Sequence, residues 1–229
     1  MSNEAEKESA GRASVSFVRE GDIVGLGTGS TAAYAVRFLA ERVRAGLNIR
    51  GIPTSMLTQQ LAAGLGIPLT TLDEFQQIDV TIDGADEVDP ELRLIKGGGG
   101  AFLREKIIAS ASRKLVIIAD STKLVSVLGK APVPVEVIPF AQALVAKEVA
   151  AMGAIVNARR DESGKPFITD EGHHILDCHF DGIEDPAALA RSLEDTPGIV
   201  EHGLFIDMAT IVLIGKKGGV QELRREPSN

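Results

Sequence analysis

The chain has 229 residues, of which 44% are hydrophobic and 24% charged, proportions that exclude a disordered or fibrous protein. The single cysteine, Cys178, excludes a disulfide framework and favours a reducing compartment. Twenty-four basic against 32 acidic residues give a net charge of −8, which argues against a nucleic-acid partner. The first residues have no signal-peptide pattern, and no apolar run approaches the ~20 residues that span a bilayer. We therefore expect a cytoplasmic protein without a membrane partner.

In the first half of the chain, short apolar runs alternate with amphipathic stretches, the pattern of an α/β protein with a parallel sheet. The first strand is expected at 23–26, and a helix follows from about Ser30. Further strands are expected at 49–52, 79–83, 92–95 and 115–119, and helices at 56–65 and 101–112. This order predicts a doubly wound, Rossmann-like sheet.

Two prolines, Pro132 and Pro134, mark a change of pattern. Beyond them we expect strands at 135–138, 154–158, 167–169, 174–180 and 199–205, and helices at 140–152 and 186–193. Apart from the short run at 167–169, which we expect in a hairpin, we interpret this segment as a ferredoxin-like β-α-β-β-α-β unit. A last apolar strand at 210–214 is expected to return to the first sheet. The prediction is a Rossmann-like catalytic domain of residues 1–131 and 208–229, with a ferredoxin-like α+β domain of residues 132–207 inserted in it.

The first candidate site is the glycine-rich turn GLGTGST at 25–31, between a strand and a helix. Glycines allow close backbone approach, the helix N-terminus offers free N–H groups to an anion, and Ser30 and Thr31 add hydroxyls. A dinucleotide site would need an acidic residue at the end of the second strand, where Thr54 and Ser55 stand instead. A phosphate-binding turn is thus favoured over a nicotinamide site, the alternative being a plain helix cap.

The second candidate is the acidic run DGADEVD at 83–89, which follows a buried strand. Ligands of open α/β sheets bind beyond the carboxyl ends of the strands, where Asp83 and Asp86 would lie. Such acids can coordinate a metal, orient a lysine or contact sugar hydroxyls. The EF-hand pattern fails because Ala85 occupies a ligand position, and a turn-capping role for Asp86 remains the alternative.

The third candidate is KGGGGAFLREK at 96–106. Four consecutive glycines cost conformational entropy, and their N–H groups can form a nest for a developing oxyanion. Lys96 is expected beside Asp83 in the same sheet, with Glu105 in the first turn of the next helix. For Glu105 the alternative is complementation of the helix dipole.

Lys123 follows the strand that ends at Ala119 and is expected at the same edge of the sheet. The four histidines, all at or after His173, have no zinc-ligand spacing, and we expect them to be surface or core residues.

The segments GLGTGSTA, IDGADEVD, LIKGGGGAFLREKI and PVPVEVIPF resemble those of the type A ribose-5-phosphate isomerases, in the same order, from about Gly21 to Gly219. The resemblance implies a metal-free, cofactor-free aldose–ketose isomerase of the pentose phosphate pathway, a homodimer or homotetramer. By position, Glu105 matches the general base of the family. The substrate-contacting segments match Thr28, Gly29, Ser30, Thr31, Asp83, Gly84, Ala85, Asp86, Lys96, Gly97, Gly98, Gly99 and Lys123.

The residues suit this chemistry. One carboxylate, Glu105, can move a proton between C2 and C1 through an enediolate. Lys96 and glycine N–H groups can stabilise the charge on oxygen, and Asp83 and Asp86 can hold sugar hydroxyls and assist ring opening.

The sequence disfavours three other functions. An amino-sugar phosphate deaminase would need a histidine near the site, and none precedes His173. A non-catalytic sugar-phosphate sensor is disfavoured by the presence of Glu105 with Lys96. An NAD-dependent oxidoreductase is disfavoured by the missing ribose-binding acid.

Overall fold

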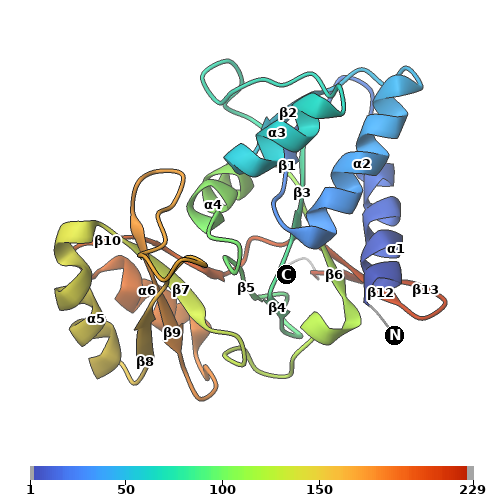
Figure 1. Cartoon of the computed structure of the whole chain (residues 1–229). Helices are drawn as coiled ribbons and strands as arrows, with labels where there is room; N and C mark the ends of the chain where they lie inside the picture. Colours follow the sequence, from blue (N-terminus) through green and yellow to red (C-terminus); the bar gives the residue numbers. More distant parts are fainter. Residues whose placement is uncertain (1–2, 226–229) are drawn as a thin grey trace. The chain divides into compact units, whose positions relative to one another are not determined.

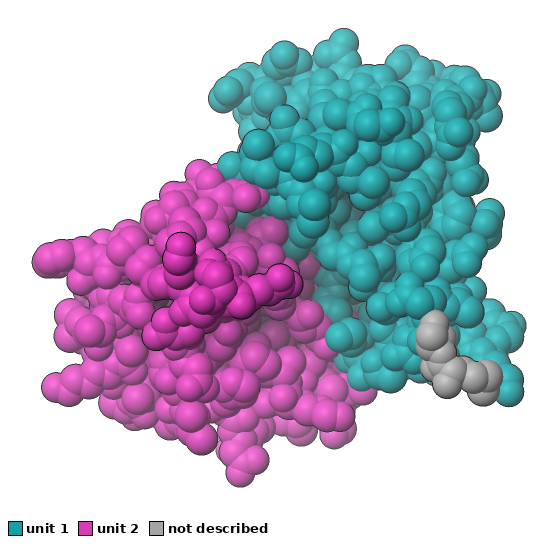
Figure 2. All heavy atoms as spheres, viewed as in Figure 1, with its two compact units in different colours: residues 1–85, 104–123, 208–229 teal, residues 86–103, 124–207 magenta. Residues whose placement is uncertain are grey.

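The computed structural model describes residues 3–225 and divides the chain into two compact units (Figure 2). Unit 1 comprises residues 1–85, 104–123 and 208–229, and unit 2 comprises residues 86–103 and 124–207. Compared with the predicted domains, unit 2 also contains 86–103 and 124–131.

Unit 1 is built on a six-stranded sheet of order β13-β12-β6-β3-β1-β2 (Figure 1). Its strands are β1 (Ile23–Leu26), β2 (Arg50–Pro53), β3 (Val80–Gly84), β6 (Leu115–Asp120), β12 (Ile211–Lys216) and β13 (Gly219–Arg224). All neighbours are parallel except β12 and β13, which form an antiparallel hairpin. The predicted return of the 210–214 strand to the first sheet is therefore confirmed.

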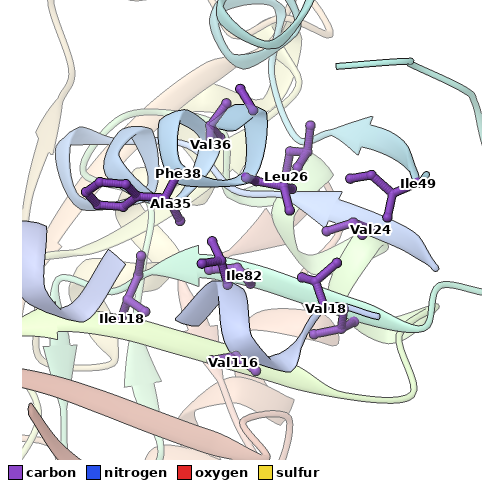
Figure 3. Packing of buried hydrophobic residues seen from close by; sticks show 14 of the residues in the cluster. Val18, Val24, Leu26, Ala35, Val36, Phe38, Ile49, Ile82, Val116 and Ile118 are labelled. Atoms are coloured by element: carbon purple, nitrogen blue, oxygen red, sulfur yellow. The ribbon is translucent and has the colours of Figure 1, made fainter. Parts of the chain in front are cut away.

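Helices α1 (Glu4–Ser14), α2 (Ser30–Arg44), α3 (Met56–Gly64) and α4 (Phe102–Ser110) accompany this sheet, with the 3₁₀ turns η1 (Val15–Phe17) and η2 (Ser121–Lys123). Val36 and Leu39 of α2 belong to the same buried apolar cluster as Leu26 of β1 and Ile82 of β3, and Figure 3 shows part of this cluster. A separate cluster joins Ile108 of α4 to Ile23, Ile52 and Ile78. Apolar burial of this kind stabilises by roughly 25 cal/mol per Å², and it packs α2 and α4 against the sheet.

Unit 2 contains a four-stranded antiparallel sheet of order β10-β7-β9-β8, made of β7 (Val133–Val137), β8 (Ile155–Ala158), β9 (His174–His179) and β10 (Ile199–His202). The helical elements are η3 (Pro139–Ala141), α5 (Gln142–Ala151) and α6 (Pro186–Glu194). Asp185 caps α6 by accepting a hydrogen bond from Ala188 N at 2.9 Å. The chain order β-α-β-β-α-β is that of the predicted ferredoxin-like unit, so the α/β fold class is confirmed.

Three strand predictions were wrong. The run at 92–95 forms only β5 (Leu94–Ile95), which pairs with β4 (Glu87–Val88) and β11 (Leu204–Phe205) in a three-stranded sheet of unit 2. The run at 199–205 is divided between β10 and β11, which belong to different sheets. Residues 167–169 form no strand, because the pairing there is limited to a short hairpin, in which Phe167 N donates to Arg159 O at 3.0 Å and Asp161 N to Lys165 O at 2.8 Å. The expected hairpin itself is present.

Candidate active site

The glycine-rich turn between β1 and α2 brings the backbone of Gly27 against Asp83. A Cβ at Gly27 would lie 2.2 Å from Asp83 Oδ1 and 2.5 Å from Asp83 Cα, so only glycine fits there. Gly29 has a φ of 110°, and α2 begins at the next residue, Ser30. Because the first N–H groups of a helix have no partner within it, this turn offers donors to an anion.

A cluster of hydroxyl groups, the Thr28 network, forms hydrogen bonds to this turn. Thr28 Oγ1 lies 2.8 Å from Thr54 Oγ1, 2.8 Å from Ser55 Oγ and 2.9 Å from Thr58 Oγ1. Thr58 Oγ1 in turn donates to Gly27 O at 3.0 Å, and Ser55 also caps α3. The roles of Thr54, Ser55 and Thr58 were not predicted from the sequence. The Ser55-x-x-Thr58 spacing at the start of a helix was the available signal.

Asp83 ends β3 with its side chain buried, the residue being 1% exposed. Its Oδ1 accepts hydrogen bonds from Thr28 N at 3.1 Å and Gly84 N at 2.7 Å. The carboxylate is thus oriented by two backbone donors, one of them in the glycine-rich turn. Asp83, the first residue of the second candidate motif, thus contacts the first motif within unit 1.

Asp86 and the glycine run meet within unit 2. Gly98 N donates to Asp86 Oδ2 at 2.8 Å, and a Cβ at Gly98 would lie 2.9 Å from Asp86 Oδ1. Gly97 has a φ of 106° and Gly100 a φ of 81°, conformations that favour glycine. Gly98 and Gly99 are both exposed.

Lys96 follows β5 and is 3% exposed, with its ammonium nitrogen 5.4 Å from the centre of the Phe205 ring. A cation over an aromatic face is stabilised by the ring quadrupole. The prediction that Lys96 lies beside Asp83 in one sheet was wrong. The strand neighbours of β3 are β1 and β6, whereas β5 belongs to the small sheet of unit 2.

Glu105 lies in the first turn of α4, where it is 5% exposed. A carboxylate at a helix N-terminus is favoured by the helix dipole, but a first-turn glutamate that only serves the dipole has no need to be buried. Its burial sets it apart from the common surface case.

Lys123 ends η2, the turn after β6, and is half-buried. Glu6 of α1 holds this turn, because its Oε2 accepts from Ser121 N at 2.9 Å and from Ser121 Oγ at 2.7 Å. Asp120, 1% exposed, accepts from Thr122 N at 3.0 Å. These supports from Glu6 and Asp120 were not predicted, since Glu6 lies more than a hundred residues away in the sequence.

The four histidines lie in unit 2, because all of them come at or after His173. His173 Nδ1 is 2.9 Å from Glu136 Oε1, and His202 is 1% exposed. Within residues 3–225, no group of three or more His, Cys, Asp or Glu side chains is arranged to hold a metal ion. In the same residues, no helix is long and apolar enough to cross a membrane.

Comparison with known proteins decides the family. The model of the family described as ribose 5-phosphate isomerase A (phosphoriboisomerase A) matches residues 50–219. A relative from Parvibaculum lavamentivorans, named ribose-5-phosphate isomerase A, is 49% identical over 96% of this chain and 97% of its own. The chain belongs to this family. It is an isomerase that interconverts D-ribose 5-phosphate and D-ribulose 5-phosphate, the family's step in the pentose phosphate pathway.

Other relatives and solved structures agree. A ribose-5-phosphate isomerase A from Gloeobacter violaceus is 53% identical over 95% of both chains. The structure of a D-ribose-5-phosphate isomerase in complex with phospho-erythronic acid has a TM-score of 0.96 and 41% identity, covering 98% of this chain and 100% of the other. The ribose 5-phosphate isomerase A of Methanocaldococcus jannaschii has a TM-score of 0.93 and 43% identity, covering 97% and 100%.

Proposed function

We propose that Glu105 is the general base of this isomerase. In the direction from aldose to ketose, its carboxylate removes the proton from C2 of the open-chain sugar and returns it to C1. Between the two transfers the substrate is an enediolate with negative charge on oxygen, and the hydroxyl proton of O2 passes to O1, so that the carbonyl moves from C1 to C2. One carboxylate serves both steps because C1 and C2 are neighbours.

Lys96 and the N–H groups of Gly97 and Gly99 stabilise that charge in this proposal, while the N–H of Gly98, which donates to Asp86 Oδ2 at 2.8 Å, holds the carboxylate of Asp86 in place. Donors fixed before the reaction stabilise a developing oxyanion without having to reorganise. Asp83 and Asp86 accept hydrogen bonds from sugar hydroxyls and assist ring opening. Gly84 and Ala85, which lie between them in the sequence, also contact the substrate. The backbone bonds that orient Asp83 and Asp86 support these roles.

Thr28, Gly29, Ser30, Thr31 and Lys123 bind the phosphate of the sugar. The glycine-rich turn supplies N–H groups and hydroxyls at the N-terminus of α2, and the ammonium group of Lys123 supplies charge. Binding energy at the phosphate orients the reacting carbons at the far end of the substrate. These local donors also offset the net charge of −8, which repels an anion.

The reaction needs no metal or cofactor in this proposal, because a lysine and backbone donors carry out the electrostatic work. Undiminished turnover in EDTA supports this, and loss of activity that Mg²⁺ or Mn²⁺ restores refutes it.

We further propose a cytoplasmic homodimer or homotetramer. The exposed apolar side chains of unit 2 support self-association, since Phe140 is 99% exposed and Leu144 57%. Light scattering of the protein as it elutes from a size-exclusion column gives the oligomeric state. A monomer at micromolar concentration contradicts the proposed oligomer.

The observation that carries the mechanism is the burial of Glu105, which follows the glycine run by a few residues. Glu105→Gln keeps the size of the side chain but cannot accept the proton, so kcat should fall by at least roughly 10² with little change in KM. Glu162→Gln is the matched control, since Glu162 is exposed. Near-normal turnover of Glu105→Gln would reduce Glu105 to a helix-terminus charge and move the base to Asp83 or Asp86.

A further inference from the structure

Arg159, just after β8, reaches the glycine run with its side chain. Its Nη1 donates to Gly97 O at 2.9 Å and to Gly98 O at 3.2 Å. Both carbonyls belong to the run proposed to stabilise the enediolate. The arginine itself lies 62 residues away in the sequence and in none of the four motifs.

The rest of the guanidinium group is held by Asp177 of β9. Nε donates to Asp177 Oδ2 at 2.9 Å and Nη2 donates to Oδ1, a paired contact of the kind that the planar fork of arginine forms with a carboxylate. The two side chains are only 13% and 20% exposed. Since Asp177 faces Asn157 across the β8–β9 pair, the guanidinium group is anchored to a sheet rather than to a loop.

The peptide between Gly97 and Gly98 is held from both sides. In a planar trans peptide the carbonyl and the N–H point in opposite directions, and residues 3–225 contain no cis peptide. Arg159 binds the carbonyl of Gly97, and Asp86 accepts from the N–H of Gly98 at 2.8 Å. Rotation of this peptide would break a hydrogen bond on each side.

The next peptide follows the same geometry. Arg159 binds the carbonyl of Gly98, so the N–H of Gly99 points away from the guanidinium group. Both glycines are exposed, and neither has a side chain that could fix its backbone. A hydrogen bond from a cation also polarises the peptide and makes its N–H a stronger donor.

We propose that Arg159, anchored by Asp177, is a positioning residue for the isomerase reaction. It orients the Gly97–Gly98 and Gly98–Gly99 peptides so that Asp86 keeps its bond and the N–H of Gly99 is directed at the substrate oxygen that becomes negatively charged. This inference rests on the proposed role of the glycine run. The alternative is that Arg159 only closes the β8–β9 hairpin.

Two substitutions separate these roles. Arg159→Lys keeps the charge but cannot hold both carbonyls and the carboxylate together. Removal of one oxyanion donor costs about 10²–10³ in kcat, so loss of its positioning should lower kcat about 10- to 100-fold, with less than a threefold change in KM. Arg159→Ala should show the same split, and added guanidinium ion at millimolar concentration should restore part of kcat.

Arg160→Lys is the matched control. Arg160 is exposed, and its Nη1 binds only the carbonyl of Gly164 in its own loop, at 2.8 Å. Urea unfolding of every variant gives the folded fraction, to which kcat is referred. The proposal is overturned if kcat per folded molecule is unchanged in both Arg159 variants, or if guanidinium ion restores nothing in Arg159→Ala.

Glu105→Gln is assayed in parallel. Comparison of the two variants distinguishes a failure of the role proposed for Arg159 from a failure of the role proposed for Glu105. If Glu105→Gln stays active while Arg159→Lys loses kcat, the base assignment fails and the role of Arg159 stands. The reverse pattern refutes the role of Arg159 alone.

Discussion

Thr58→Val should destabilise the protein by about 2 kcal/mol, because it removes one hydroxyl from a buried network. Thr58 is 4% exposed, and valine has nearly the same shape. Each hydroxyl carries a single proton. Thr58 donates its proton to Gly27 O at 3.0 Å and accepts that of Ser55 Oγ at 3.2 Å, so two hydrogen bonds are lost. At about 1 kcal/mol for each bond, the sum is about 2 kcal/mol.

The same change should weaken substrate binding. The carbonyl that Thr58 holds belongs to Gly27, at the start of the turn proposed to bind phosphate. With that carbonyl released, Thr28 also loses a hydroxyl neighbour at 2.9 Å, and the turn is less well ordered before the substrate arrives. KM for ribose 5-phosphate should therefore rise more than kcat falls.

Urea unfolding measures the change in stability, with Thr71→Val as the control. Thr71 is exposed, and a surface substitution of this kind should stay within about 0.5 kcal/mol of the parent protein. If Thr58→Val is as stable as Thr71→Val and binds substrate as well, the Thr28 network does not support the turn.

Three further outcomes are expected. Lys123→Ala should raise KM about tenfold or more, because a hydrogen bond from a charged donor contributes about 1.5–3 kcal/mol; unchanged KM and kcat would remove Lys123 from the phosphate site. Burial raises the pKa of Cys178 to about 12, so a thiol reagent should react with it only after unfolding, and fast labelling of the native protein would contradict this. Burial raises the pKa of Glu136 above its ordinary value of 4.5, despite hydrogen bonds from His173 and Thr169. Its contribution to stability is thus greatest below pH 4.5 and is lost as pH rises through the raised pKa. In urea unfolding the stability of the parent protein relative to Glu136→Gln should fall from pH 4.5 towards 7, and a constant difference would refute the shift.

The long buried strands could be predicted from the sequence, whereas the short ones could not. β6 and β12 are continuous apolar runs, which are typical of strands covered on both faces. β5 has only two residues, and its pairing with β4 and β11 depends on tertiary contacts that periodicity does not carry. For this reason the 92–95 run was assigned to the wrong sheet.

The same distinction applies to the candidate site, where some features could be predicted from the sequence and others could not. The glycine-rich turn and its link to Asp83 could be predicted because glycine spacing and strand ends are local features. The supports of the site come from distant parts of the chain: Thr58 bonds across 31 residues to Gly27, and Glu6 across 115 residues to Ser121. A serine, threonine or glutamate has many possible partners, and only the fold selects one of them.

Exchange of the C2 proton of ribose 5-phosphate with D₂O tests the role of Glu105 most directly. This exchange reports proton abstraction at C2 itself, separately from ring opening and product release. With Glu105→Gln, deuterium incorporation and isomerisation should both fall by at least roughly 10², in the same proportion. If the variant still exchanges the C2 proton at the parent rate while isomerisation is lost, another group removes that proton, and Glu105 is not the base.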